Sequence, residues 1–177
     1  MARIAIETVL RQMNAAYRDD PFHALRKNVE SVRPGEWDVR PSGWTVEEFG
    51  TQPELSICDL VLHVAGAKFM YADRAFGDAS LEWADIALPP ARDMPAVLAW
   101  LDEGHQRLEA GLTALTDDEE LAAERLAPWR APMRRAQLIS IIINHDLYHS
   151  GEINRQRALI RGTQGWDRGG GAGTGRA

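Results

Sequence analysis

The feature that most constrains the fold of this 177-residue chain is a long helical pattern near its C-terminus. Apolar residues recur at helical spacing from about Pro132 to Arg161, and no proline interrupts them after the first position. Gly162 follows directly and is a suitable C-cap. Residues 139–143 are β-prone by propensity, but they lie inside about 30 residues of one helical period. We therefore predict a long helix with one buried face, beginning near Pro132.

Three further helical patterns precede this one. The first covers residues 4–32 and has a break at which Asp20 is expected to cap a short second part. The other two cover residues 54–76, where Gly66 and its alanine neighbours would let another helix approach closely, and residues 93–115. No alternation of apolar and polar residues indicates a β-hairpin. The chain is therefore expected to be all-α.

The connections between these helices differ in length. Residues 33–53 contain three prolines, three glycines and two tryptophans, which predicts an irregular loop that packs on the helices. Thr116 and Glu119 have the spacing of a capping box for one short helical turn. Four main helices with one long loop between the first and second predict a four-helix bundle. We expect this domain to cover residues 1–165, followed by a disordered glycine-rich tail at residues 166–177.

Composition excludes several classes of protein. The net charge is -6 at pH 7 without a concentrated basic patch, so a nucleic-acid partner is not expected. The single cysteine, Cys58, rules out an internal disulfide and a cysteine-based metal site, and it is expected to be a small core residue. Neither a signal peptide nor a stretch of roughly 18 apolar residues is present, so we expect a cytoplasmic protein without a membrane partner.

Two of the five histidines, His145 and His149, lie one helical turn apart on the apolar face of the predicted last helix. Residues at this spacing have Cβ atoms roughly 5–6 Å apart, so both imidazoles can reach one cation. Burying imidazoles among aliphatic side chains costs free energy unless the rings are hydrogen-bonded or bind a metal. The pair is therefore a candidate metal site, and two hydrogen-bonded core histidines are the alternative.

His63 is the natural third ligand because it lies midway along the predicted second helix on its inward stripe. Three histidines would leave coordination positions open for water or substrate. Zinc, nickel, iron and manganese are all compatible with histidine ligands. Asp59 and Glu152 are candidates for contacts to the ligands or for a fourth ligand, although solvated helix charges explain each equally well. His105 is expected to be a packed or partly exposed core residue, and a contact to the metal ligands is the alternative.

A metalloprotease also spaces two zinc-binding histidines four residues apart. Its mechanism uses a glutamate directly after the first histidine as general base. In this chain Asp146 occupies that position, and no histidine follows His149. The sequence therefore argues against a protease.

The combination of His63, the His145-x-x-x-His149 pair, the residues 151–156 that follow it and the Trp44 loop resembles the DinB-like (damage-inducible, YfiT-like) metal-binding four-helix bundles. The resemblance covers roughly residues 4–162. It implies that His63, His145 and His149 bind a divalent metal ion and that the chain forms a homodimer. Some members of this family are transferases or isomerases that use bacillithiol or mycothiol, where the metal would lower the pKa of the thiol.

Two functions are compatible with the sequence. The first is an enzyme, a metal-dependent thiol S-transferase or hydrolase acting on a small-molecule substrate. In that case the loop between Trp37 and Trp44 would help to form the pocket, and the residues expected to contact the ligands or substrate are Asp59, Asn144, Glu152 and Arg155. The second is a non-catalytic, stress-related dimeric protein whose metal joins two helices. The sequence does not choose between them.

Overall fold

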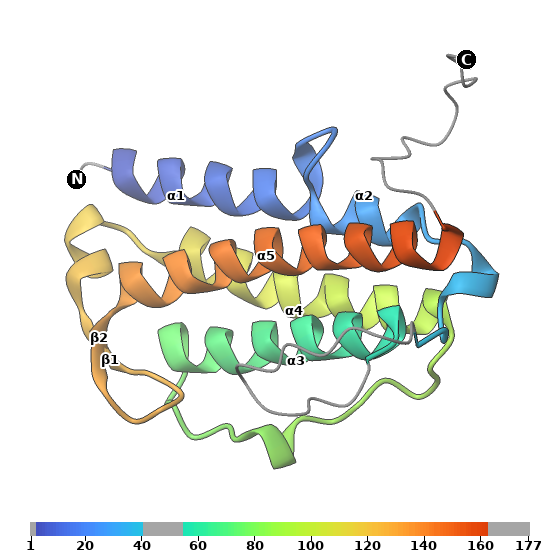
Figure 1. Cartoon of the computed structure of the whole chain (residues 1–177). Helices are drawn as coiled ribbons and strands as arrows, with labels where there is room; N and C mark the ends of the chain where they lie inside the picture. The colour runs from blue at the N-terminus through green and yellow to red at the C-terminus, as the bar shows by residue number, and fades with distance from the viewer. Residues whose placement is uncertain (1–2, 41–54, 163–177) are drawn as a thin grey trace.

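In the part of the chain that the structure describes, four long helical segments lie side by side and confirm the predicted all-α bundle (Figure 1). The computed structural model describes residues 3–40 and 55–162. The main helices are α1 (Ile4–Asn14), α3 (Ile57–Phe76), α4 (Met94–Ala114) and α5 (Arg135–Arg161). The predictions for the Trp44 region and for the glycine-rich tail fall outside the described residues.

The first bundle helix is interrupted, as its sequence predicts. α1 continues into a π-helical turn, Ala15–Asp19, which ends where the backbone N–H of Asp20 donates to the carbonyl of Ala15. The Asp20 carboxylate accepts hydrogen bonds from the backbone N–H groups of Phe22 and His23, which precede α2 (Leu25–Glu30). The prediction that Asp20 caps this short helix is therefore wrong.

The ends of the other helices follow local side-chain chemistry. Asp93 accepts a hydrogen bond from the backbone of Ala96 and caps α4, and Gly162 ends α5 in the left-handed conformation with φ 66°. Both predicted caps are confirmed. The short 3-10 turn Asp118–Ala122 has its capping box at Asp117 and Glu120, one residue later than predicted.

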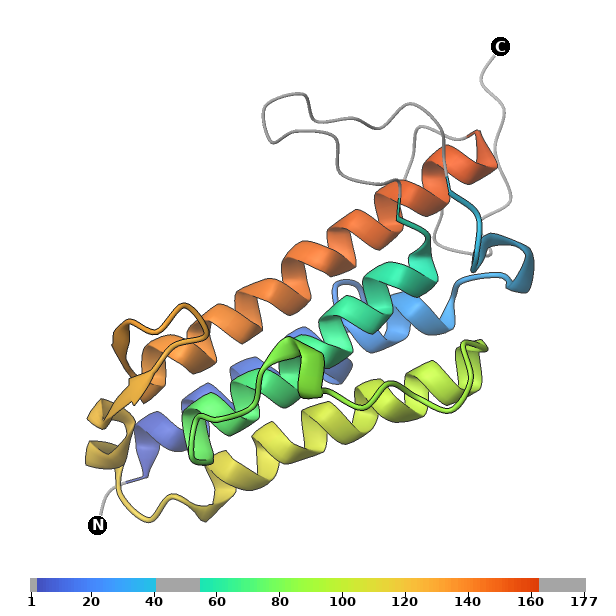
Figure 2. The ribbon, with the colours of Figure 1, turned by 90° about the horizontal axis from the view of Figure 1, so that it is seen from below.

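The helices do not alternate in direction. α1 and α5 run one way, whereas α3 and α4 both run the other way (Figures 1 and 2). Because α3 and α4 are parallel, residues 77–93 must return along the bundle before α4 can begin. This second long connection crosses over α3 and contains the 3-10 turn Trp83–Asp85 (Figure 2). The sequence led us to expect only one long loop, between the first and second helices.

A small hairpin precedes α5. The strand β1 (Glu124–Leu126) pairs antiparallel with β2 (Pro132–Arg134), so the prediction that no hairpin exists is wrong. Strands of three residues are too short to show a period of two in the sequence. The hairpin also sets the start of α5 at Arg135 rather than near Pro132.

The core consists of two apolar clusters, and α3 contributes residues to both. Cys58 is buried in it, as predicted, and His105 is buried with its Nε2 atom 2.8 Å from Asn14 Oδ1 and its ring stacked on Tyr17. Among the described residues, none of the helices combines the length and apolar character needed to cross a membrane.

A buried ion pair joins α3 to α5 and was not expected from the sequence. Lys68 Nζ lies 2.5 Å from Asp146 Oδ2, and both side chains are at most 1% exposed. The ammonium group also lies 4.7 Å from the centre of the Tyr17 ring. Burial lowers the pKa of Lys68 and raises the pKa of Asp146, while their mutual attraction opposes both shifts. The two groups therefore depend on each other inside the core.

Removing one partner of this pair is expected to destabilise the fold strongly. Lys68→Met or Asp146→Asn should each lower the free energy of unfolding by about 3–5 kcal/mol, because the remaining group stays buried without its partner. The double variant Lys68→Met/Asp146→Leu should recover most of that loss. Urea unfolding in the presence of a chelator measures these changes without a contribution from metal.

The matched control is the exposed pair of Glu103 and Arg107 on α4. Glu103→Gln should change the free energy of unfolding by less than about 1 kcal/mol. An equally small effect of Asp146→Asn would contradict a structural role for the buried pair.

Candidate metal centre

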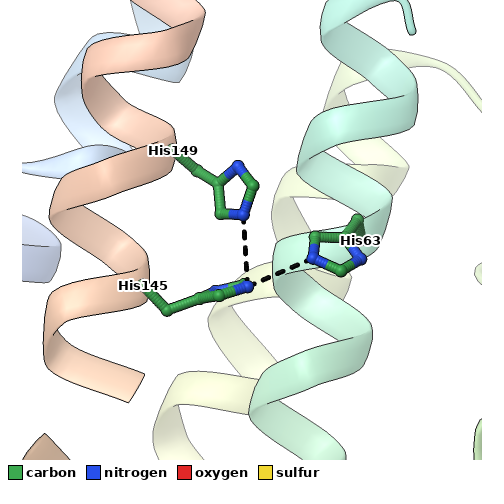
Figure 3. A group of neighbouring side chains, drawn as sticks. All are labelled: His63, His145 and His149. Carbon is green, nitrogen blue, oxygen red and sulfur yellow. Dashed lines mark hydrogen bonds between the residues drawn. The ribbon is translucent and has the colours of Figure 1, made fainter. Parts of the chain in front are cut away.

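Three histidine side chains from two helices converge in the space between those helices (Figure 3). His145 and His149 extend from adjacent turns of α5, and His63 extends toward them from the middle of α3 (Figure 3). His149 is buried, His145 is half-buried and His63 is exposed. The cluster therefore lies where the α3–α5 interface meets the surface.

The spacing of the three Nε2 atoms matches the coordination of one shared metal ion. His145 Nε2 lies 3.1 Å from His63 Nε2 and 3.2 Å from His149 Nε2. The three nitrogen atoms all lie within 4.8 Å of one another. Tetrahedral zinc with Zn–N bonds of roughly 2.0–2.1 Å separates its nitrogen ligands by about 3.3 Å. The three atoms are thus close to the positions that one small cation requires.

Counting protons supports the same conclusion. His149 Nδ1 lies 2.7 Å from Glu152 Oε2, so the Nδ1–H group donates a hydrogen bond to the carboxylate, and the Nε2 of a neutral ring then carries a lone pair. His145 Nε2 lies within hydrogen-bond distance of the Nε2 atoms of both His63 and His149, but it carries at most one proton and can donate to only one of them. Lone pairs therefore face one another in this cluster unless a cation or an added proton lies between them, so the donor set fits a metal ion.

The protonation equilibria favour the form that binds metals. Burial, with smaller contributions from His149 and His63, lowers the pKa of His145 to about 3. Partial burial, followed by the nearby His149, also lowers the pKa of His63 below its usual value. Both imidazoles are therefore neutral near pH 7. A neutral ring is what coordination requires.

Aromatic rings flank the cluster on both helices. The indole of Trp83 stacks on His63, with 5.5 Å between ring centres and an angle of 13° between ring planes. On α5, the ring of Tyr148 meets His149 edge-on at 4.9 Å. Trp83 is 48% exposed and Tyr148 is 69% exposed, so both rings reach the surface beside the cluster.

The other predicted site residues are distributed differently. Glu152 lies beside the cluster through its hydrogen bond to His149. Asp59 lies at the N-terminus of α3, where its carboxylate accepts hydrogen bonds from Ser56 and pairs with arginine side chains rather than with a histidine. Arg155 is exposed on α5, and Asn144 lines a groove of about 730 Å³ between α1 and α5 that none of the three histidines lines.

Two features of this region escaped the sequence reasoning. One is the buried pair of Lys68 and Asp146, and the other is Trp83. Gly66, one turn after His63, was interpreted as a contact point for a helix, whereas it is the ring of Trp83 that lies against it. The sequence of a loop does not show which helix a tryptophan in it contacts. Gly66, on the same face of α3 as His63, was the residue that indicated a close contact at this point.

An all-α bundle with a three-histidine cluster between two of its helices is a fold with a site suited to metal binding. Comparison with family models identifies which class of bundle this is. The model of the DinB superfamily matches residues 19–153, a range that includes all three histidines and Glu152. The chain belongs to the DinB superfamily, which confirms the resemblance found in the sequence. A search of curated proteins found no match to this chain.

The hydrogen bond from His149 to Glu152 leads to a test of the cluster. Glu152→Ala should weaken metal binding by about 10–100-fold, because the carboxylate no longer fixes the tautomer and orientation of His149. Glu152→Gln keeps an acceptor oxygen and should cause a smaller loss. Competition with a coloured chelator measures both affinities. Glu103→Gln on α4 is the control, and an unchanged affinity in Glu152→Ala would show that the hydrogen bond has no role in metal binding.

Proposed function

We propose that this protein binds a divalent metal ion through His63, His145 and His149 and uses it to activate a small thiol for transfer to a second substrate. The observation that carries the proposal is the convergence of three imidazole nitrogens, one of them on an exposed residue. Three protein ligands leave coordination positions for a further group. Membership of the DinB superfamily agrees with a metal-binding role.

The residues around the ion would have distinct tasks. A bound divalent ion would supply the positive charge that lowers the pKa of a thiol and stabilises its thiolate. Glu152 holds the Nδ1 proton of His149 and so keeps the Nε2 lone pair directed at the cluster. Trp83 stacks on His63 and Tyr148 contacts His149, so these two rings would shield the ion from water on either side, while the exposed His63 would lie on the side accessible to substrate.

The competing proposal is a non-catalytic protein in which the ion joins α3 to α5. These two helices already share both apolar clusters and the buried pair of Lys68 and Asp146. An ion at the surface end of that interface adds little to a contact that is complete without it. The structure of the interface therefore favours the enzyme.

The proposal further includes a cytoplasmic homodimer with one metal centre in each subunit.

Metal content tests the first half of the proposal. Protein purified without chelator should hold about one divalent ion per chain, as one three-ligand site predicts. His63→Ala and His149→Ala should lose stoichiometric metal while circular dichroism shows unchanged helix content, because the apolar core supports the bundle. Elemental analysis gives the stoichiometry and identifies the metal.

His23→Ala is the matched control because His23 is exposed and lies outside the cluster. It should retain the full metal content. Wild-type protein that contains no metal and gains none on titration would show that the metal proposal is wrong.

Thiol transfer tests the second half. The metal-loaded protein should accelerate the reaction of bacillithiol, mycothiol or another cellular thiol with an electrophilic acceptor. His63→Ala should lose this activity, and His23→Ala should keep it. Product formation is followed by mass spectrometry. A protein that binds metal but accelerates transfer from none of these thiols would contradict the transferase function and leave the metal site intact.

A further inference from the structure

The three imidazoles of the cluster are held in three different ways. Glu152 fixes the ring of His149 through a hydrogen bond to Nδ1. His145 is half-buried in the helix interface, and its Nδ1 atom is buried without a hydrogen bond to the described part of the chain. His63 is exposed, and within residues 3–40 and 55–162 its contacts beyond its histidine partner are ring contacts. Among these contacts, the stacked indole of Trp83 is the one from outside the cluster.

Trp83 is itself fixed by contacts on both sides of its 3-10 turn. The backbone N–H of Glu82 donates to Asp85 Oδ2 at 3.2 Å, which closes the turn. The carboxylate of Glu82 accepts a hydrogen bond from Arg74 Nη2 at 3.0 Å, and a second arginine, Arg130, pairs with the same oxygen. The side chain of Arg74 is fully buried on α3. The turn that carries Trp83 is therefore anchored to the helix that carries His63.

Gly66 is the residue of α3 against which the Trp83 indole packs. This residue lies three positions after His63 and thus on the same face of α3. A Cβ atom at this position would lie 2.6 Å from Cζ3 of Trp83, well inside van der Waals contact. Only glycine lets the ring lie this close to the helix. A glycine in the middle of a 20-residue helix lowers helix propensity, so its presence agrees with a packing requirement at this point.

We infer that Trp83 is a positioning residue for the third metal ligand: its indole holds the His63 ring in the orientation that directs Nε2 at His145. An exposed histidine on a helix otherwise turns freely about its side-chain torsions, and ordering it on metal binding costs conformational entropy. A stacked ring that is already in place removes part of this cost. The inference rests on the proposed metal site and names a residue outside its ligand set.

Three substitutions separate the possible roles of Trp83. Trp83→Ala removes the ring and should weaken Co²⁺ binding by about 10–100-fold, as loss of a contact that orients a ligand does elsewhere. Trp83→Phe keeps an aromatic face and should restore most of the affinity. Gly66→Ala keeps the indole but displaces it from the helix, and it should weaken binding as Trp83→Ala does. Alanine favours the helix more than glycine does, so a weakened helix cannot explain that loss.

The measurements are Co²⁺ affinity by chelator competition and the visible absorption spectrum of the Co²⁺ protein, which reports the number and geometry of the ligands. In Trp83→Ala and Gly66→Ala we expect the spectrum to change toward that of a two-histidine site with more water ligands. Trp129→Ala is the matched control, because Trp129 is 57% exposed and makes no ring contact with the cluster. It should bind Co²⁺ as the wild type does.

Two results would overturn the inference without touching the proposed metal site. One is wild-type affinity and an unchanged spectrum in Trp83→Ala. The other is a loss of affinity that Trp83→Phe fails to restore and that follows a lower stability of the metal-free protein, which would show that the ring only supports the fold. A wild-type protein that does not bind Co²⁺ at all would overturn both the metal site and this inference.

Discussion

The buried ion pair between Lys68 and Asp146 is the interaction on which the geometry of the histidine cluster depends. It joins the two helices that carry the ligands, with Lys68 just over one turn after His63 and Asp146 next to His145. An ion pair inside a core is favourable only when its two groups meet, since each group alone would be strongly destabilising. The pair therefore specifies how α3 and α5 are aligned along their length. That alignment brings His63 level with the two histidines of α5.

The sequence was sufficient to predict the structural features that depend on a regular spacing of nearby residues. The stripe on the last helix predicted that His145 and His149 face inward, and the position of His63 on the second helix predicted its place opposite them. His63 was also expected to face inward, whereas it is exposed, because the cluster lies at the surface end of the interface. Helix ends were also predictable where a single residue sets them, through the side chain of Asp93 or the left-handed backbone of Gly162. These features depend on residues only a few positions apart, and such spacing is visible without a structure.

Features that depend on distant partners were not predictable in the same way. Asp59 has the spacing of a residue that could assist His63, but two arginines and Ser56 occupy its carboxylate. Lys68 was one more charge on a helix until Asp146 was found opposite it. The direction of α4 relative to α3 depends on how the apolar faces of the helices pack together. The apolar period of a sequence indicates which face of a helix is buried, but not whether the helix runs parallel or antiparallel to its neighbour. The place of Trp83 follows from that direction, so it could not be inferred earlier.

The parallel arrangement of α3 and α4 has a consequence for how such a site can diversify. Because the chain must return along α3, its connecting segment passes over the ligand helix, and one of its side chains contacts a ligand. The framework of the site and its outer wall therefore belong to different parts of the chain. Substitutions, insertions or deletions within residues 77–93 can alter what approaches the histidines while the helices that hold them stay the same. Because Trp83 orients His63, this freedom belongs to the positions of the segment other than Trp83, where selectivity can change while the ligand geometry is kept.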